Sequence, residues 1–329
     1  MAGVLEIMGF QFGELESAIP ANLHNQRGFW ERQDVIDIND DILRAIDCGW
    51  DDLRQFHPDR VQALACPDIE QRIRKLLAEL TSRGPAFLKD PRLCLTLPIW
   101  CRVQPPAAVV EVLRPPLEVA ASLVRRGDTS LMGGLALWEG YVRAAQAQRP
   151  EAPTFVVRFD QFRRDPYNGA LALAGKMRTA GIPLPGVITP EQIANWFDAS
   201  LVNFVEDETF RDAVPPPVAR LWEHMCRAGE TPVSAPYAPS AFAVDALKYL
   251  IEKTRKDEAD VRRLTLVRDH YKQRMNIVDE CIHAFRESRL GRVYFALART
   301  VSRLSGREKA LTPFDQIEAV LDKHRRNEY

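Results

Sequence analysis

The chain has 329 residues, enough for one α/β domain of ordinary size with an appendage, or for two small domains. Its 44 Lys and Arg and 45 Asp and Glu give a formal net charge of −1, so no global field attracts it to nucleic acid or to an anionic bilayer. The 6 cysteines are scattered, without a C-x-x-C pair or a zinc-like spacing. We recognise no signal peptide and no apolar run of membrane length. We therefore expect a cytoplasmic protein with free thiols, no metal and no nucleic-acid partner.

The residues up to about Phe210 alternate short apolar runs with amphipathic segments. This pattern is typical of an α/β fold, in which a parallel sheet is flanked by helices. The opening stretch AGVLEIMGFQFG is expected to be the end of a helix that runs into a loop. The helical spacing of Ile69, Ile73, Leu76 and Leu80 predicts the next helix. Further helices are expected through LCLTLPIW, LEVAASLVRR, SLMGGLALWEGYVRAAQAQ and, after a capping box at Thr189, IANWF.

Three segments are expected to be strands: AFL before KDPR, then AAVVEVLR, then TFVVRFD. The run AAVVEVLR is rich in β-branched residues and almost wholly apolar, which predicts a strand that is buried on both faces. This strand ends at Arg114. Pro115 and Pro116 can begin the following helix, because a proline at the first helical position loses no donor that the helix needs.

The composition changes between about Arg211 and Ser240, where proline-rich segments interrupt both periodicities. We expect a domain over residues 1–210, a linker over 211–240 and a mostly helical extension over 241–329. In the extension, apolar residues at alternating three-four spacing from Leu247 to Phe285 predict one long helix or two. This stripe can pair with a second copy of the chain or pack back on the domain. Arginines flank a shorter amphipathic helix that follows, which can rest on an anionic membrane or, more ordinarily, pack against the preceding helix.

Three groups of residues can carry chemistry, and the first is the segment from Arg114 to Ser122. An arginine at the carboxyl end of a buried strand, followed by a helix start, suits a phosphate, because open α/β sheets bind ligands at that edge. The guanidinium can bind two phosphate oxygens, the helix start favours the same anion, and Ser122 can add a hydrogen bond. The structural alternative is that Arg114 pairs with Glu118 and that Ser122 is a small packing residue.

The second group, Lys89-Asp90-Pro91-Arg92, also follows a predicted strand. Two cations and a carboxylate at a strand end can bind an anion and offset the charge that develops on a leaving phosphate. The alternative is an ordinary Asp-Pro turn with surface ion pairs.

The third group is Asn25-Gln-Arg-Gly28-Phe-Trp30-Glu31. Its glycine permits a tight turn beside two aromatic residues, and Glu31 is a candidate general base for an acceptor hydroxyl. A glutamate at the start of a helix is more often a favourable partner of the helix dipole.

In this order, the segments resemble the bacterial sulfotransferases that use 3′-phosphoadenosine 5′-phosphosulfate. The resemblance covers roughly the first two-thirds of the chain. It runs through GFQFG, NQRGFWE, LKDPRLCLTLPIW, VVEVLRPPLEVAASLVRR, LALWEGYVRA, VVRFDQFRRDP and, more weakly, WFDASL. The most specific part is KDPRLCLTLPIW followed by R-x-P-L-E-V-A-x-S-L.

The resemblance implies a P-loop-like parallel sheet and transfer of a sulfuryl group to a hydroxyl or amine of a carbohydrate, lipid or small-molecule acceptor. It implies that Arg114 and Ser122 hold the 3′-phosphate of the nucleotide. It places Lys89, Asp90 and Arg92 near the acceptor and the transferring group, with Glu31 as the base.

One departure from the family pattern concerns the N-terminus. Family members begin with a strand and a loop resembling G-x-x-R-S-G-T-S, whose backbone N–H groups hold the 5′-phosphosulfate. Here Met1 falls where that loop has just ended, and Gly133-Gly134 lies in a helical pattern without the cation and hydroxyls required. Either the natural chain starts upstream, which we favour, or the loop is lost. In both cases we expect residues 1–329 to transfer sulfate very poorly. The alternative functions are a noncatalytic nucleotide- or partner-binding module and an interaction scaffold.

Overall fold

The computed structural model describes residues 1–13, 30–127, 129–197 and 214–304. The chain divides into two units, Met1–Glu252 and Lys253–Tyr329, and each is described by itself. The Asn25 to Phe29 part of the third motif and the end of WFDASL lie outside the described residues.

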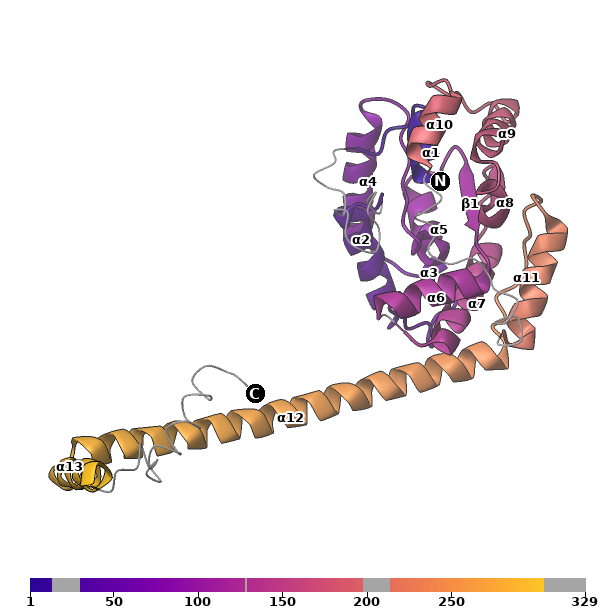
Figure 1. The fold of residues 1–329 in the computed structure, drawn as a ribbon. Coiled ribbons are helices and arrows are strands. Elements are labelled where there is room, and N and C mark those ends of the chain that lie inside the picture. The colour runs from indigo at the N-terminus through magenta and orange to yellow at the C-terminus, as the bar shows by residue number, and fades with distance from the viewer. Residues whose placement is uncertain (14–29, 128, 198–213, 305–329) are drawn as a thin grey trace. The chain divides into compact units, whose positions relative to one another are not determined.

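The first unit is mostly helical and holds a small parallel sheet flanked by helices (Figure 1). In the described residues this sheet has two strands, β1 (Val109–Leu113) and β2 (Thr154–Arg158). They pair in parallel, with Val109 opposite Thr154 and Leu113 opposite Arg158. The expectation of a parallel sheet covered by helices is confirmed at this level.

The segment AFL, expected as a strand, forms only an isolated parallel bridge between Gln11 and Ala86. The Gln11 amide donates to the Pro85 carbonyl at 2.9 Å, and the Phe87 amide donates to the Gln11 carbonyl at 2.9 Å. After the bridge, residues 87–90 have no regular structure, and a turn at Pro91 leads into the next helix. Lys89 lies three residues after this point of parallel pairing.

The prediction that β1 is buried on both faces is wrong. Only Leu113 is fully buried, and the side chain of Val112 is 40% exposed. The described sheet contains only two strands, so few neighbouring side chains cover the strand faces. An apolar run alone did not reveal this, because burial depends on how many elements surround the strand.

The helices of the first unit follow the predicted order, with several short additions. They are α1 (Ala2–Ile7), α2 (Gln33–Arg44), α3 (Pro58–Gln62), α4 (Pro67–Thr81), α5 (Leu93–Val103), α6 (Pro116–Arg126), α7 (Leu131–Ala147), α8 (Phe159–Phe162), α9 (Pro166–Thr179), α10 (Pro190–Trp196) and α11 (Pro216–Ala228). The capping box at Thr189 is present: the Gln192 amide donates to Thr189 Oγ1, and the Thr189 amide donates to Gln192 Oε1. Prolines at the first turn and polar caps thus set several helix starts as the sequence predicts.

Three hydrophobic clusters hold the first unit together. The largest joins α2, α4, α5 and α7, and it includes Ile42, Ile73 and Ile99, which are fully buried. The second joins α1, α9 and α10 with the sheet, and the third joins α6, α7 and α11. The segment 211–240, expected as a linker, therefore contains a packed helix, because Val218, Leu221 and Met225 of α11 form an apolar stripe.

Helices α6 and α7 lie unusually close together (Figure 1). A Cβ atom on Gly134 of α7 would stand 2.8 Å from the Cα and 3.0 Å from the Cβ of Ala120 on α6. Real side chains do not approach so closely, so this crossing requires glycine. Gly133-Gly134 is thus part of a helix, as its apolar surroundings predict.

The start of α12 (Ala241–Glu287) is fixed by a buried carboxylate of α7. Glu139 accepts hydrogen bonds from the Ser240 amide at 2.9 Å and from Ser240 Oγ at 2.7 Å. Ser240 Oγ in turn accepts from the Ala243 amide, as a helix cap does. Leu247 of this first part of α12 is buried in the largest cluster.

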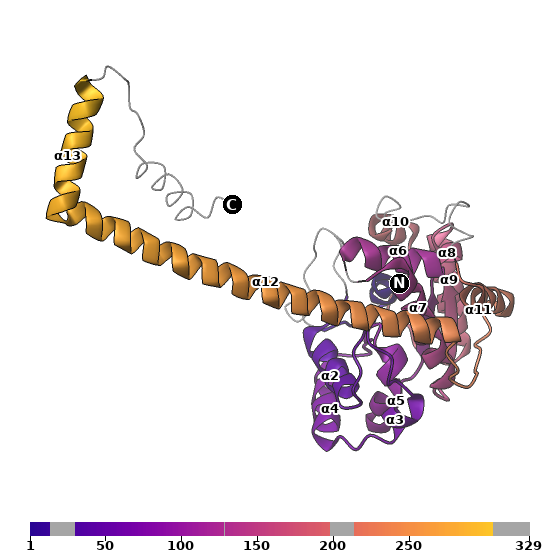
Figure 2. The ribbon, with the colours of Figure 1, turned by 90° about the horizontal axis from the view of Figure 1, so that it is seen from below.

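The second unit contains the rest of α12 and then α13 (Arg289–Leu304). The predicted stripe thus belongs to one long helix, and Figure 2 shows its bend into α13. Ser288 caps α13, because the Gly291 amide donates to its Oγ at 3.0 Å. Among the described residues, no helix is both long and apolar enough to span a bilayer.

Candidate functional site

Arg114 follows β1 directly and precedes the two prolines that begin α6. Its guanidinium carbon lies 5.1 Å from the centre of the Phe159 ring, which follows β2. Its carbonyl accepts a hydrogen bond from Trp138 Nε1 at 3.0 Å, so the backbone at the strand end is held by α7. The side chain is 40% exposed, with a buried Nε that has no hydrogen-bond partner among the described residues. Its outer nitrogens therefore reach solvent at the carboxyl edge of the sheet.

Glu118 is the carboxylate that pairs with Arg114, and the ion pair between them is long. The closest approach, from Arg114 Nη2 to Glu118 Oε2, is 3.8 Å, too long for a hydrogen bond. Arg163 Nη1 instead donates to Glu118 Oε1 at 2.6 Å. Arg114 thus forms an ion pair with Glu118, as the structural alternative expects, but Arg163 holds the same carboxylate more closely.

The surroundings of Arg114 are cationic. Burial of the inner part of its side chain lowers the pKa of Arg114, and the nearby charges of Arg163, Arg125 and Arg126 lower it further, against the opposing effect of Glu118. Arginines whose charges disfavour one another in this way favour an added anion. Ser122 lies one helical turn after Glu118 on α6 and is half-buried. The structure therefore keeps Ser122 on the helix face that carries Glu118.

Glu31 and Lys89 meet although they are far apart in the sequence. Lys89 Nζ contacts Glu31 Oε1, and the carboxylate is the more buried of the two groups. Glu31 is preceded by Trp30, whose φ of 53° lies in the left-handed region that a bulky residue rarely adopts. Trp30 packs edge-on against Phe12. Such backbone strain is concentrated at functional sites, because packing must hold it in place.

Asp90 and Arg92 are turned into a local network. Asp90 accepts hydrogen bonds from the Arg92 amide at 2.7 Å and from Arg92 Nη1 at 3.3 Å, and its side chain is fully buried. Arg92 Nε lies 2.7 Å from Asp40 Oδ1. Burial raises the pKa of Asp40, and the positive charge of Arg92 opposes that effect. Arg92 is therefore held between two carboxylates, an arrangement that stabilises the turn after Lys89.

The charges of Lys89 and Arg114 both affect the amino group of Met1. Burial lowers the pKa of the Met1 amino group to about 5, and the positive charges of Lys89 and Arg114 add to this effect. Both cations thus lie within electrostatic range of the start of α1. Of the residues singled out in the sequence, Glu31 contacts Lys89, Arg114 and Ser122 lie at the end of β1 and on α6, and Asp90 and Arg92 form the turn after Lys89.

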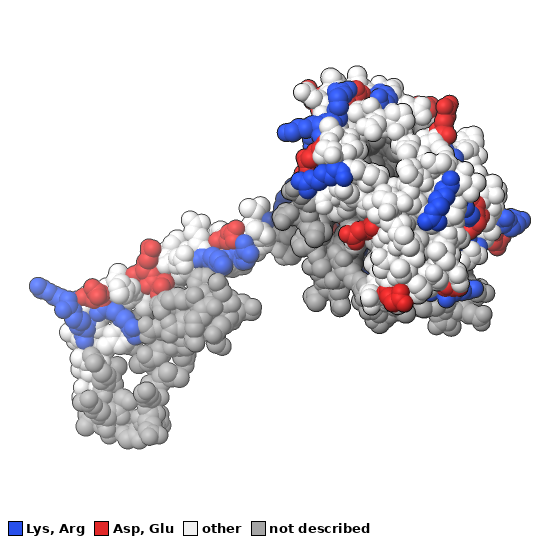
Figure 3. Space-filling model, turned by 90° about the horizontal axis from the view of Figure 1, so that it is seen from above, with Lys and Arg blue, Asp and Glu red and all other residues white. Residues whose placement is uncertain are grey.

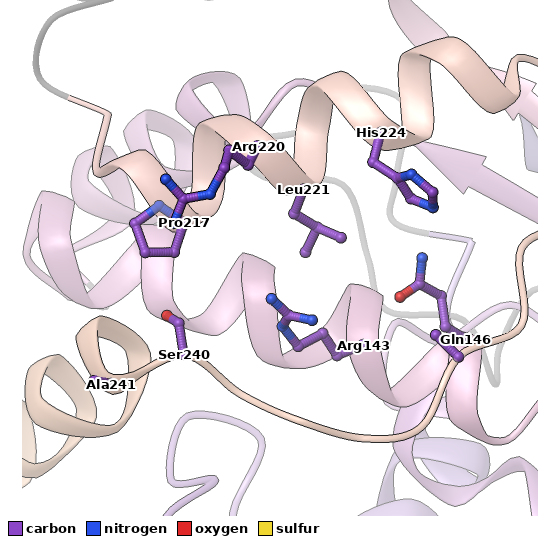
Figure 4. A pocket seen from close by; sticks show the side chains of 9 residues that line it. Arg143, Gln146, Pro217, Arg220, Leu221, His224, Ser240 and Ala241 are labelled. Carbon is purple, nitrogen blue, oxygen red and sulfur yellow. The ribbon is translucent and has the colours of Figure 1, made fainter.

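A cleft that sequence reasoning missed opens between α7 and α11, with a volume of about 550 Å³ (Figure 4). It contains none of the predicted site residues. Arg143 and Gln146 reach it from α7, and Arg220 and His224 reach it from α11. Arg143 also donates to Glu139 at 2.7 Å. The sequence carried no signal for this cleft, because its residues are spread over two helices without a motif.

Charged side chains of both signs are interspersed on the face of the first unit seen in Figure 3. This agrees with the balanced composition of the chain. Comparison of the chain with protein-family models, with curated proteins and with solved structures found no match.

Proposed function

We propose that the chain is a sulfotransferase-like protein whose first unit binds 3′-phosphoadenosine 5′-phosphosulfate at the carboxyl edge of a P-loop-like sheet. The observation that carries the proposal is the state of Arg114. Its guanidinium follows a parallel strand, is packed on Phe159, and approaches Glu118 only to 3.8 Å, while Arg163 donates a hydrogen bond to the other oxygen of that carboxylate. A phosphate there would gain a charge-assisted forked contact at little ordering cost.

Glu31 and Lys89 have the chemistry that transfer to an acceptor requires. In the proposed reaction, an acceptor oxygen or nitrogen attacks sulfur, the bond from sulfur to the phosphate oxygen breaks, and the nucleotide leaves with the electron pair. Glu31 takes the proton of the acceptor, and Lys89 offsets charge on the leaving phosphate. Their contact in the structure supports a shared role, since each is already held near the other.

The first test is calorimetric titration with 3′-phosphoadenosine 5′-phosphate. We expect the protein to bind, and Arg114→Ala to weaken binding by roughly tenfold to a hundredfold, as the loss of a charge-assisted contact does. The matched control is Arg220→Ala, which removes an arginine of the α7–α11 cleft. If Arg114→Ala leaves the affinity unchanged and Arg220→Ala lowers it, the anion site lies in the α7–α11 cleft and the proposal is wrong.

A second measurement separates catalysis from binding. With radiolabelled donor and a panel of carbohydrate, lipid and amine acceptors, we expect residues 1–329 to turn over very slowly, because no segment resembling G-x-x-R-S-G-T-S occurs within them. Glu31→Gln should remove the remaining transfer while leaving nucleotide affinity unchanged. Binding without any transfer, in every acceptor tested, would favour the noncatalytic nucleotide-binding module instead.

A further inference from the structure

The part of α12 in the second unit carries an apolar seam interrupted by two opposite charges. With alternating steps of three and four residues, the seam runs through Thr254, Asp257, Val261, Leu264, Arg268 and Tyr271. This is the spacing of the contact positions in a coiled coil. Asp257 and Arg268 occupy two of those contact positions, so any partner helix has to accommodate both charges.

The central seam is exposed. The side chains of Val261, Leu264 and Tyr271 are 62%, 66% and 62% exposed. The two ends of the stripe are used otherwise: Leu247 is buried in the core of the first unit, and Phe285 packs against Tyr294 of α13. The part of the stripe that carries both interrupting charges spans Thr254 to Tyr271, about 27 Å of helix at 1.5 Å per residue.

We infer that this seam pairs with a second copy of itself in the antiparallel direction. In the antiparallel register centred between Arg262 and Arg263, Asp257 lies opposite Arg268 of the second copy, and this pair occurs twice. The same register places Val261 opposite Leu264, and Thr254 opposite Tyr271. Each interrupting charge then faces an opposite charge. Every layer also pairs an a position of one helix with a d position of the other, as antiparallel coiled coils do.

The parallel arrangement is disfavoured by the same two residues. It would place Asp257 opposite Asp257 and Arg268 opposite Arg268 in the desolvated seam. Parallel pairing would gain an attraction at the rim between Arg274 and Asp279, but rim pairs contribute far less than like charges in a seam cost. The contact of Arg268 with Asp269 in the same helix is exposed, so the guanidinium can exchange it for the second copy's Asp257.

The experiment measures self-association of the full chain by sedimentation equilibrium. We expect a dimer, with Asp257→Arg and Arg268→Asp each weakening the dimer by at least about tenfold because each places arginines or carboxylates opposite one another twice. An equimolar mixture of the two variants should dimerise again. The matched control is Glu280→Arg, the same charge change on the side of the helix away from the seam. A monomeric wild type overturns the proposal, as does a dimer that tolerates both charge reversals.

Cys281 reports the direction of pairing. It is exposed on α12, outside the central seam. In the antiparallel register the two copies of Cys281 lie about 55 Å apart along the helix axis, whereas in the parallel one they are neighbours. Mild oxidation of the wild type should therefore form no disulfide between the two copies of Cys281. The variant Cys281→Ser identifies any cross-link that does depend on this residue. Formation of such a cross-link in the wild type would overturn the antiparallel arrangement even if the dimer itself is found.

Discussion

Two carboxylates on consecutive helices are equally buried and differ in what they contact. Glu118 of α6 and Glu139 of α7 are both 0% exposed. Both oxygens of Glu139 are satisfied, by Arg143 and by the Ser240 amide and hydroxyl. Glu118 has one satisfied oxygen, while its Oε2 has no hydrogen-bond partner among the described residues.

The difference indicates which region is built for stability and which for binding. A buried ion with all its hydrogen bonds made is a structural clamp, and here it fixes the start of α12 on α7. A buried ion with an unmet oxygen, beside a partly exposed arginine, marks a site whose contacts are incomplete. Burial alone would have classed the two glutamates together.

The strongest test of this difference is to remove Glu139, the carboxylate whose hydrogen bonds are all made. We expect Glu139→Ala to lower the free energy of unfolding by about 3–5 kcal/mol, because Arg143 and both Ser240 donors lose their acceptor at once. Urea denaturation followed by circular dichroism measures the change. Glu223→Ala, an exposed position on α11, is the control and should stay near wild type.

Deleting the other carboxylate should cost less. For Glu118→Ala we expect about 1–3 kcal/mol, because Arg163 and Arg114 can both turn toward water. The same denaturation experiment applies. If the two glutamates prove equally costly, the distinction between a clamp and an incomplete site is wrong.

The ring beneath Arg114 offers a smaller test that rests on the proposed function. Phe159→Ala removes the surface on which the guanidinium packs, and we expect the affinity for 3′-phosphoadenosine 5′-phosphate to fall by about two- to fivefold. The matched control is Trp222→Phe, which alters the equivalent packing beneath Arg158, also at 5.1 Å. Titration calorimetry distinguishes the two, and equal effects would show that stacking at Arg114 has no special role.

The smallest expected effect concerns the ionisation of Tyr237, whose pKa is affected by the charge of the buried Glu139. Burial raises the pKa of Tyr237 to about 12, and the negative charges of Cys48 and Glu139 contribute. An unfolded tyrosine ionises near pH 10, roughly its ordinary pKa. The stabilising effect is therefore fully present below pH 10 and is lost as the pH rises toward 12. Urea midpoints at several alkaline pH values should fall less steeply for Tyr237→Phe. Identical slopes would contradict the assignment.

Local signals in the sequence predicted much of the fold. Pro116, Ser130 and Thr189 begin helices, and the helical spacing from Ile69 to Leu80 gave α4. These features act within a few residues, so the sequence contains them completely. The partial exposure of β1 and the packing of α11 depended on distant neighbours, which a periodic pattern does not specify.

For the candidate site, too, local features were predictable from the sequence and contacts between distant residues were not. The sequence placed Arg114 at the end of a strand, which the structure shows, whereas the contact of Lys89 with Glu31 joins residues 58 positions apart that no local pattern links. The orientation of Arg92 between Asp40 and Asp90 was not predictable, because Asp40 comes from a helix 50 residues earlier in the chain. Nor did any local pattern predict that Arg163 would join Arg114 beside Glu118.

The close crossing of α6 and α7 makes the two carboxylates mechanically dependent on one small residue. Gly134 touches the backbone of Ala120, which lies two residues after Glu118, while Glu139 follows Gly134 by five residues. A single methyl group at Gly134 would act as a wedge and tilt one helix against the other. A change that carries no charge would then loosen the contacts that tie each glutamate to another segment, Arg163 to Glu118 and Ser240 to Glu139.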